Sequence, residues 1–238
     1  MRALAIVYER DAGPGVFEQQ AEAEGVAMDR WVATQEDAPP QEPARYDAVV
    51  VLGASTHADQ EEENPWLREQ KALVGELLER GTPLIGVCLG SQLLAEAAGA
   101  APVRLERPEI GWFGVGLTAE GRDDPVTGRL PATFTAFEWH SYAAPLPPGA
   151  EALASSEACL QAFRLGEEAW GVQFHPEVAL ADAESWIDDI RPGSDPARIG
   201  IEPAAFRAET RDAMAAWNRL GRDLFSGFLE AARARAPR

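Results

Sequence analysis

Residues 83–94 read PLIGVCLGSQLL, an apolar run that passes through a glycine-flanked cysteine into a helix-like stretch. The first half is apolar almost throughout, as a strand buried on both faces must be. The second half continues in residues that favour a helix. A buried strand that turns directly into a helix is the unit from which parallel sheets are built. The stretch therefore predicts an α/β fold with Cys88 at the carboxyl end of a central strand.

The same alternation of strand and helix runs through the first hundred residues. We expect strands at 3–8, 26–32, 47–52 and 84–87 and helices at 16–24, 66–80 and 91–99. From about 101 to 174, short runs separated by Gly and Pro predict a small antiparallel β extension beside the main sheet, which ends in a strand at 169–174. A helix at 182–190, a loop at 191–196 and one or two amphipathic helices over 203–234 follow. The expected architecture has three layers, a mostly parallel sheet flanked by helices.

Composition limits the classes of function that the chain can have. It has 238 residues, 46% hydrophobic and 25% charged, which predicts a soluble globular protein with one core. A net charge of −18 repels nucleic acid and anionic membranes, so neither is expected as a partner. The first apolar run is too short for a signal peptide, and no run approaches the ~20 apolar residues of a membrane span. The two cysteines, Cys88 and Cys159, both lie in apolar, strand-adjacent surroundings, which predicts free thiols and a cytoplasmic location.

Cys88 is a candidate nucleophile. Gly86 and Gly90 stand two residues before and after it, as in turns that lift a nucleophilic side chain out of a strand-to-helix connection. The N-terminus of the following helix favours the thiolate and can bring a cysteine pKa down to about 3.5–7.5. A buried cysteine at a strand end is otherwise most often an ordinary apolar core residue.

A second segment supplies the groups that thiol chemistry needs. His175-Pro176-Glu177 follows an apolar strand, and in an extended chain residues two apart project to the same side. The carboxylate of Glu177 can then orient the imidazole of His175, which acts as base and acid. A strand-end His with a solvated Glu is the structural alternative.

The segments 86–92 (GVCLGSQ) and 171–177 (GVQFHPE) together resemble the class I glutamine amidotransferases with a Cys-His-Glu triad. The resemblance is closest to stand-alone members similar to the glutaminase domain of GMP synthase, and it extends over residues 1–190. It implies a flavodoxin-like amidotransferase fold, with residues 191–238 as a helical extension packed on the same domain. It also implies that Cys88 is the nucleophile, His175 the general base and acid, and Glu177 its orienting partner.

The resemblance also implies further site residues. The backbone N–H of Leu89 is one expected oxyanion donor, and the loop at Gly53 and Ala54 supplies the other. The family commonly shows Gly-Gly-Pro in that loop, whereas this chain keeps only the first Gly. Substrate contacts are expected from the four residues Gln92, His140, Ser141 and Tyr142, although Gln92 has a helix-capping role as its alternative. Ser141 and Tyr142 depart from the usual Trp-His-Gly-Asp pattern and predict an altered pocket.

The implied reaction is hydrolysis of a γ-glutamyl amide through a cysteine thioester, which releases glutamate and ammonia or an amine. No cofactor and no metal are expected, since His57 and His140 do not show the spacing of a metal site. Three functions stay open. The protein is a glutaminase that passes ammonia to a separate synthetase chain, or a stand-alone γ-glutamyl peptidase acting on a small metabolite, or a catalytically silent binding or regulatory protein.

Overall fold

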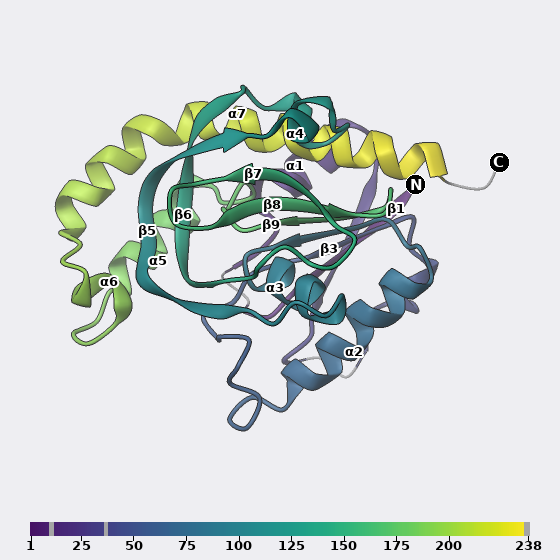
Figure 1. The fold of residues 1–238 in the computed structure, drawn as a ribbon, viewed down its shortest axis with the longest axis horizontal. Helices are drawn as coiled ribbons and strands as arrows, with labels where there is room; N and C mark the ends of the chain where they lie inside the picture. The colour runs from purple at the N-terminus through teal and green to yellow at the C-terminus, as the bar shows by residue number, and fades with distance from the viewer. Residues whose placement is uncertain (10–11, 36–37, 236–238) are drawn as a thin grey trace.

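One sheet forms the centre of the molecule in the computed structural model, which describes residues 1–9, 12–35 and 38–235. In these residues nine strands follow the order β2-β1-β3-β4-β9-β8-β7-β5-β6 (Figure 1). The first five of that order are parallel: β2 (Ala27–Val32), β1 (Arg2–Val7), β3 (Ala48–Val51), β4 (Leu84–Val87) and β9 (Ala169–Val172). The other four are antiparallel: β8 (Leu160–Leu165), β7 (Glu151–Ser155), β5 (Val103–Leu117) and β6 (Thr133–Ala143).

The predicted fold class is therefore confirmed, with one difference in the position of the antiparallel strands. They continue the main sheet instead of lying beside it, because β8 pairs antiparallel with β9. An edge strand with unpaired N–H and C=O groups is a template for further pairing, and β9 uses its edge in this way. The five parallel strands keep the order typical of doubly wound sheets, in which ligands bind beyond the carboxyl ends.

Helices cover both faces of the sheet, as Figure 1 shows. Along β3, Ala48 and Val50 belong to one apolar cluster and Val49 and Val51 to the other, because successive side chains point to opposite faces. Burial on both sides is the reason that the strand is apolar throughout. One face carries α1 (Gly15–Ala23), α5 (Leu180–Asp188) and α7 (Pro203–Arg235), and the other carries α2 (Trp66–Glu79) and α3 (Leu89–Ala97).

The last helix, α7, is a single helix of 33 residues that packs on α1 and α5. Its predicted apolar stripe is buried at Trp217, Leu224, Phe225 and Phe228, and Phe225 stacks on Phe17 of α1 with 4.3 Å between the ring centroids. Gly221 lies inside the helix, where glycine costs about 1 kcal/mol relative to alanine. A Cβ at this position would lie 2.0 Å from the carbonyl oxygen of Pro176, so the close approach requires glycine. Residues 236–238, at the end of the predicted tail, lie outside the described residues.

Several element boundaries differ from the sequence-based expectation. The strand predicted at 169–174 ends at Val172, and the loop predicted at 191–196 already contains the start of α6 (Asp195–Arg198). A short helix, α4 (Ala119–Asp123), and two 3₁₀ turns, η1 (Pro43–Arg45) and η2 (Thr127–Arg129), were not predicted. These elements are too short to show the apolar periodicity from which a helix is predicted. None of the helices in the described ranges combines the length and apolarity needed to cross a bilayer.

Candidate active site

Cys88 occupies the turn between β4 and α3. The helix begins at Leu89, two residues earlier than predicted, so Cys88 is itself the N-cap. Its φ of 52° makes it the one non-glycine residue with positive φ in the described ranges. Such a conformation costs about 1–3 kcal/mol and is found where the surrounding structure enforces it. Cys88 N–H donates to Val172 O at 2.8 Å, and Cys88 O accepts from Gln92 N–H at 3.1 Å.

The two flanking glycines are required by close packing around this turn. A Cβ on Gly86 would lie 2.4 Å from the carbonyl oxygen of Gly90. A Cβ on Gly90 would lie 2.0 Å from the carbonyl oxygen of Val51 in β3. The glycines therefore let α3 start tightly against two strands, which directs the first N–H groups of the helix to the thiol.

His175 follows β9 and forms a buried pair with Glu177. Its Nδ1 lies 2.8 Å from Glu177 Oε1, and its side chain is 5% exposed. The backbone of His175 is held from two sides, because its N–H donates to Phe137 O at 3.0 Å and its carbonyl oxygen accepts from Trp217 Nε1 at 2.9 Å. The indole of Trp186 meets the imidazole edge to face, with 5.0 Å between ring centroids. This frame fixes the ring orientation.

The environment of His175 favours its charged form. Burial lowers the pKa of this imidazole, but the charges of Glu177 and Cys88 outweigh burial and hold the pKa well above its usual value. Its Nε2 is buried and forms no hydrogen bond to any described residue. A donor that is charged, oriented by Glu177 and placed beside Cys88 can give its proton to a reacting group.

Gly53 lies against both the thiol and the imidazole. A Cβ at Gly53 would lie 3.1 Å from His175 Cε1 and 3.3 Å from Cys88 Cβ, so both side chains flank this glycine. The loop that follows is tied back by Glu9, whose carboxylate accepts from Ser55 N–H at 3.0 Å. Because that amide is occupied, Gly53 and Ala54 remain the expected oxyanion donors of the loop.

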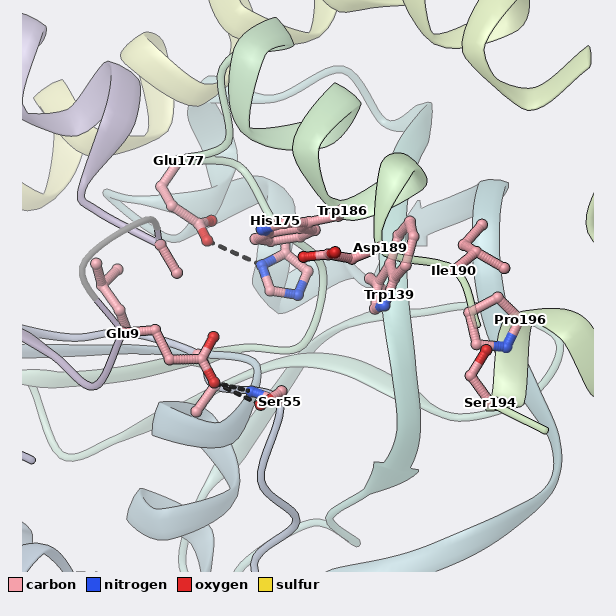
Figure 2. A pocket seen from close by; sticks show the side chains of 14 residues that line it. Glu9, Ser55, Trp139, His175, Glu177, Trp186, Asp189, Ile190, Ser194 and Pro196 are labelled. Atoms are coloured by element: carbon pink, nitrogen blue, oxygen red, sulfur yellow. Dashed lines mark hydrogen bonds and ion pairs between the residues drawn. The ribbon is translucent and has the colours of Figure 1, made fainter. Parts of the chain in front are cut away.

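Two adjoining cavities hold the predicted residues. The first, here called the Cys88 pocket, has a volume of about 430 Å³ and includes Cys88, Leu89, Gln92, His140, Ser141 and Tyr142 in its lining. The second, called the His175 pocket, has a volume of about 270 Å³ and includes Gly53, His175 and Glu177 (Figure 2). Five of the described residues line both cavities: Ala54, Ser55, Trp139, Ser194 and Pro196. The structure thus gathers every residue expected from the sequence around one centre, at the carboxyl ends of β3, β4 and β9.

Several of the expected substrate-binding residues already have partners within the protein. Gln92 Nε2 donates to Tyr142 O at 2.9 Å and to Gln173 Oε1 at 3.1 Å. Ser141 Oγ donates to Asp195, and Tyr142 Oη donates to Asp59 at 2.9 Å. These contacts fix the side chains that form the walls of the Cys88 pocket.

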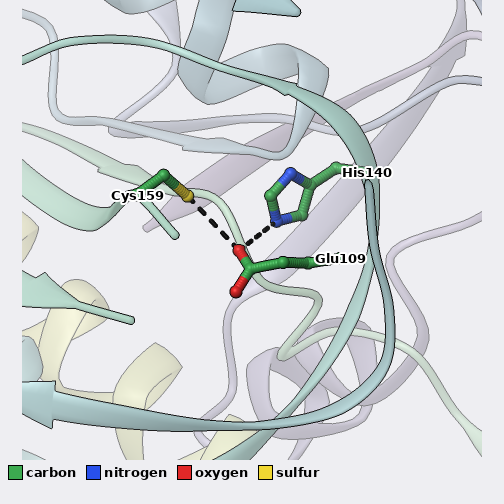
Figure 3. Close-up of side chains that lie close together, drawn as sticks. All are labelled: Glu109, His140 and Cys159. Atoms are coloured by element: carbon green, nitrogen blue, oxygen red, sulfur yellow. Dashed lines mark hydrogen bonds and ion pairs between the residues drawn. The ribbon is translucent and has the colours of Figure 1, made fainter. Parts of the chain in front are cut away.

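His140 belongs to a separate buried cluster (Figure 3). Its Nε2 lies 3.2 Å from carboxylate oxygens of both Glu109 and Glu138, and its Nδ1 lies 3.0 Å from Tyr142 O. Burial lowers the pKa of His140, but the hydrogen bonds to Glu109 and Glu138 outweigh burial and raise the pKa to about 10. The imidazolium balances charge between two buried carboxylates, which explains its position through ion pairing.

Cys159 joins the same cluster, which corrects the apolar surroundings predicted for it. Its Sγ lies 3.3 Å from Glu109 Oε2, and both cysteines are free. Potential ligand atoms of Glu109, His140 and Cys159 lie within 4.8 Å of one another, a grouping that could hold a metal. His57 lies outside this grouping and packs on the ring of Tyr142, at 4.7 Å between centroids.

The region beyond residue 185 supplies functional surroundings that the sequence pattern did not predict. Trp186, Ile190, Ser194 and Pro196 line the His175 pocket, and Asp195 lines the Cys88 pocket. Asp195 pairs with Arg104 at 2.9 Å. A Pro- and Gly-containing loop gives no periodicity that would place it over a site, so only the path of the chain in space reveals this role.

Comparison with known proteins gives the same picture. The model of the family "Glutamine amidotransferase class-I" matches residues 17–189. The glutamine amidotransferase-like protein YfeJ of Salmonella typhimurium is 30% identical over 191 residues, which cover 79% of this chain and 80% of YfeJ. The γ-glutamyl-L-1-hydroxyisopropylamide hydrolase of a Pseudomonas species is 32% identical over 60% of this chain and 50% of its own length. A glutamine-hydrolysing GMP synthase subunit of Haloarcula marismortui is 39% identical over 44% of this chain and 56% of its own length.

Among solved structures, a glutamine amidotransferase from Thermotoga maritima matches with a TM-score of 0.86 and 28% identity. The match covers 97% of this chain and 98% of that one. Sequence, fold and site geometry agree, and this chain belongs to the class I glutamine amidotransferase family.

Proposed function

We propose that this protein hydrolyses γ-glutamyl amides through a thioester on Cys88. The observation that carries the proposal is the position of His175: its Nδ1 is held by Glu177 at 2.8 Å, and its imidazole and the Cys88 side chain both lie against Gly53. The arrangement matches the requirements for a base that serves a nearby nucleophile.

The raised pKa of His175 favours an imidazolium in the free protein. In the proposed reaction the Cys88 thiol reacts as the thiolate. The thiolate attacks the γ-carbonyl carbon, the C–N bond breaks, and Nε2 gives its proton to the leaving nitrogen. Neutral His175 then takes a proton from water, whose oxygen attacks the thioester. Glutamate leaves, the thiolate returns and the imidazolium is restored. Glu177 stabilises the positive ring in both halves of the reaction.

The oxyanion formed in each half needs fixed donors. The N–H of Leu89 stands at the start of α3, and the loop at Gly53 and Ala54 lies beside the thiol. In other acyl-transfer enzymes one such donor contributes roughly 10² to 10³ in rate. Ala54 keeps its N–H although the family's second glycine is missing, so the loop can still serve this role.

The names of the relatives support a γ-glutamyl amide as the substrate. One relative is a hydrolase of a γ-glutamyl hydroxyisopropylamide, and another is a glutamine-hydrolysing subunit of GMP synthase. The first acts on a substituted amide, whereas the second is one subunit of a synthase. The pocket of this chain favours hydrolysis without a synthetase partner, because the cavity beside His175 is larger than ammonia requires.

Covalent labelling tests the proposal. A chloroketone analogue of glutamine should add one adduct to the purified protein, visible by intact-mass spectrometry, and Cys88→Ala should abolish it. Cys159→Ala is the matched control and should keep the adduct. An adduct that survives Cys88→Ala but disappears in Cys159→Ala would show that the nucleophile is assigned to the wrong cysteine. A protein with no adduct and no glutamate release would be a binding or regulatory member of the family.

A further inference from the structure

The two reacting side chains line different cavities that adjoin each other. Cys88 lines one cavity but not the other, and His175 lines the second but not the first. Attack by the thiolate puts the carbonyl carbon of the substrate at Cys88. The leaving nitrogen must reach the proton on His175, so any substituent on that nitrogen extends to the imidazole side. The acyl half therefore belongs in the Cys88 pocket and the leaving amine in the His175 pocket.

The His175 pocket is larger than ammonia requires. Its volume is about 270 Å³. A small molecule such as water occupies about 30 Å³ in the liquid, and ammonia is of similar size. A site that only releases ammonia has no use for a cavity of this volume, whereas an amine with several carbon atoms would fill it.

The walls of the His175 pocket are mainly apolar (Figure 2). Trp139 and Trp186 meet edge to face with 5.7 Å between centroids, and Ile190 and Pro196 continue the wall. The indole of Trp186 also touches the imidazole, so the apolar wall starts at the proton donor. Burial of alkyl or aromatic groups against such walls contributes about 25 cal/mol per Å² of apolar surface.

The charges in the His175 pocket select among substituted amines. Besides Glu177, the carboxylates of Glu9 and Asp189 line it, and none of the described lining residues is Lys or Arg. Asp189 pairs at the surface with Arg191 at 2.7 Å. This lining disfavours a leaving group with its own carboxylate, such as an amino acid, and suits an amine that leaves as an alkylammonium ion. The Cys88 pocket instead contains Arg104, Arg198 and Asp195, which suit the charged end of a glutamyl group.

We propose that the His175 pocket is the leaving-group subsite for γ-glutamyl amides of apolar alkyl- or arylalkylamines. This inference rests on the proposed function and narrows its substrate class. Water is the acceptor, and the products are glutamate and the free amine. Glutamine is a poor substrate because it leaves the apolar pocket empty.

Initial rates of glutamate release test the inference on four substrates: glutamine, γ-glutamyl-n-butylamide, γ-glutamylbenzylamide and γ-glutamylleucine. Because one methylene in an apolar pocket changes kcat/KM by about 10-fold or more, the two apolar amides should exceed glutamine at least tenfold. They should also exceed γ-glutamylleucine, because its carboxylate would be repelled by Glu9 and Asp189 in the lining of the His175 pocket.

A pair of variants tests whether the preference for apolar amides comes from the His175 pocket. Ile190 lines only the His175 pocket, so Ile190→Asp should reduce the ratio of kcat/KM for butylamide to that for glutamine about tenfold. Leu146→Asp introduces the same charge at a side chain outside both cavities, 45% exposed, and should keep the ratio.

The outcomes separate this inference from the proposed function. Glutamine turned over as fast as the apolar amides, or an unchanged ratio in Ile190→Asp, would overturn the leaving-group assignment while leaving the thioester chemistry in place. Absence of glutamate from all four substrates, together with no chloroketone adduct on Cys88, would overturn both.

Discussion

Two imidazole–carboxylate clusters in the described residues differ in what lies beside the ring. Nε2 of His140 lies 3.2 Å from carboxylate oxygens of both Glu109 and Glu138, and its Nδ1 lies 3.0 Å from the carbonyl oxygen of Tyr142. His175 has one carboxylate, that of Glu177, 2.8 Å from Nδ1, and its imidazole lies with the Cys88 side chain against Gly53. Both rings are buried and both have a raised pKa. Burial and a shifted pKa alone therefore do not mark a reacting histidine; a position beside the candidate nucleophile does.

Replacing the histidine by glutamine should give different results in the two clusters, and the largest effect is expected at His175. His175→Gln removes the proton donor, so kcat on the preferred γ-glutamyl amide should fall by at least about 10⁴-fold, as in other nucleophile–base pairs. Steady-state kinetics measures the loss, with circular dichroism as the check that the fold is kept. A loss below tenfold would mean that His175 is no more catalytic than His140.

His140→Gln should instead act on stability. It leaves Glu109 and Glu138 buried beside each other without a cation, and breaking a buried ion pair in this way typically costs about 3–5 kcal/mol. Urea unfolding should show the decrease in the free energy of unfolding. The double variant Glu138→Gln/His140→Gln is the control, because removing the buried charge should recover part of the loss. If His140→Gln unfolds like the parent protein but loses turnover, the contrast between the clusters is wrong.

A smaller effect is expected in the pH dependence of stability. The pKa of His140 is about 10 in the folded protein and about 6.5 when unfolded. Between these values the folded state holds the extra proton, so the stabilisation is complete below pH ~6.5 and is lost as pH rises through 10, at up to about 1.4 kcal/mol per pH unit.

His175 contributes in the same direction, since its pKa is also raised. Urea titrations from pH 6 to 10 on the parent protein and on His140→Gln isolate the contribution of His140. A slope that is equal in the two proteins would show that His140 is not the group that titrates.

The sequence predicts the residues at the centre of the site but not the residues that surround it. Cys88 and His175 could be predicted because each stands at the end of a strand that is apolar throughout, and burial on both faces forces that pattern. Trp186 and Asp195 could not, because their place depends on how the chain beyond residue 185 returns across the sheet edge. The sequence predicts apolar surroundings for Cys159, because Glu109, its neighbour in space, is far from it in the chain.

The sequence pattern also could not show that α7 is one continuous helix. The sequence predicts one or two amphipathic helices over 203–234, and Gly221 and Gly227 lower the helix propensity of that stretch. The structure shows that each glycine meets a carbonyl oxygen, that of Pro176 for Gly221 and that of Pro125 for Gly227, at distances where a Cβ does not fit. At such positions tertiary contacts, and not helix propensity, determine which residue is present and whether the helix continues.

The contact of α7 with the backbone of the site has a consequence for how the protein opens. Trp217 donates to the carbonyl oxygen of His175, and Asn218 donates to that of Val178 at 2.8 Å. The same segment also receives the first turn of α1 through the bond from Val16 N–H to Glu177 O at 2.8 Å. Residues 175–178 are therefore bonded to both α1 and α7. Any local opening that frees this segment has to break its bonds to both helices, which raises the free energy of that opening.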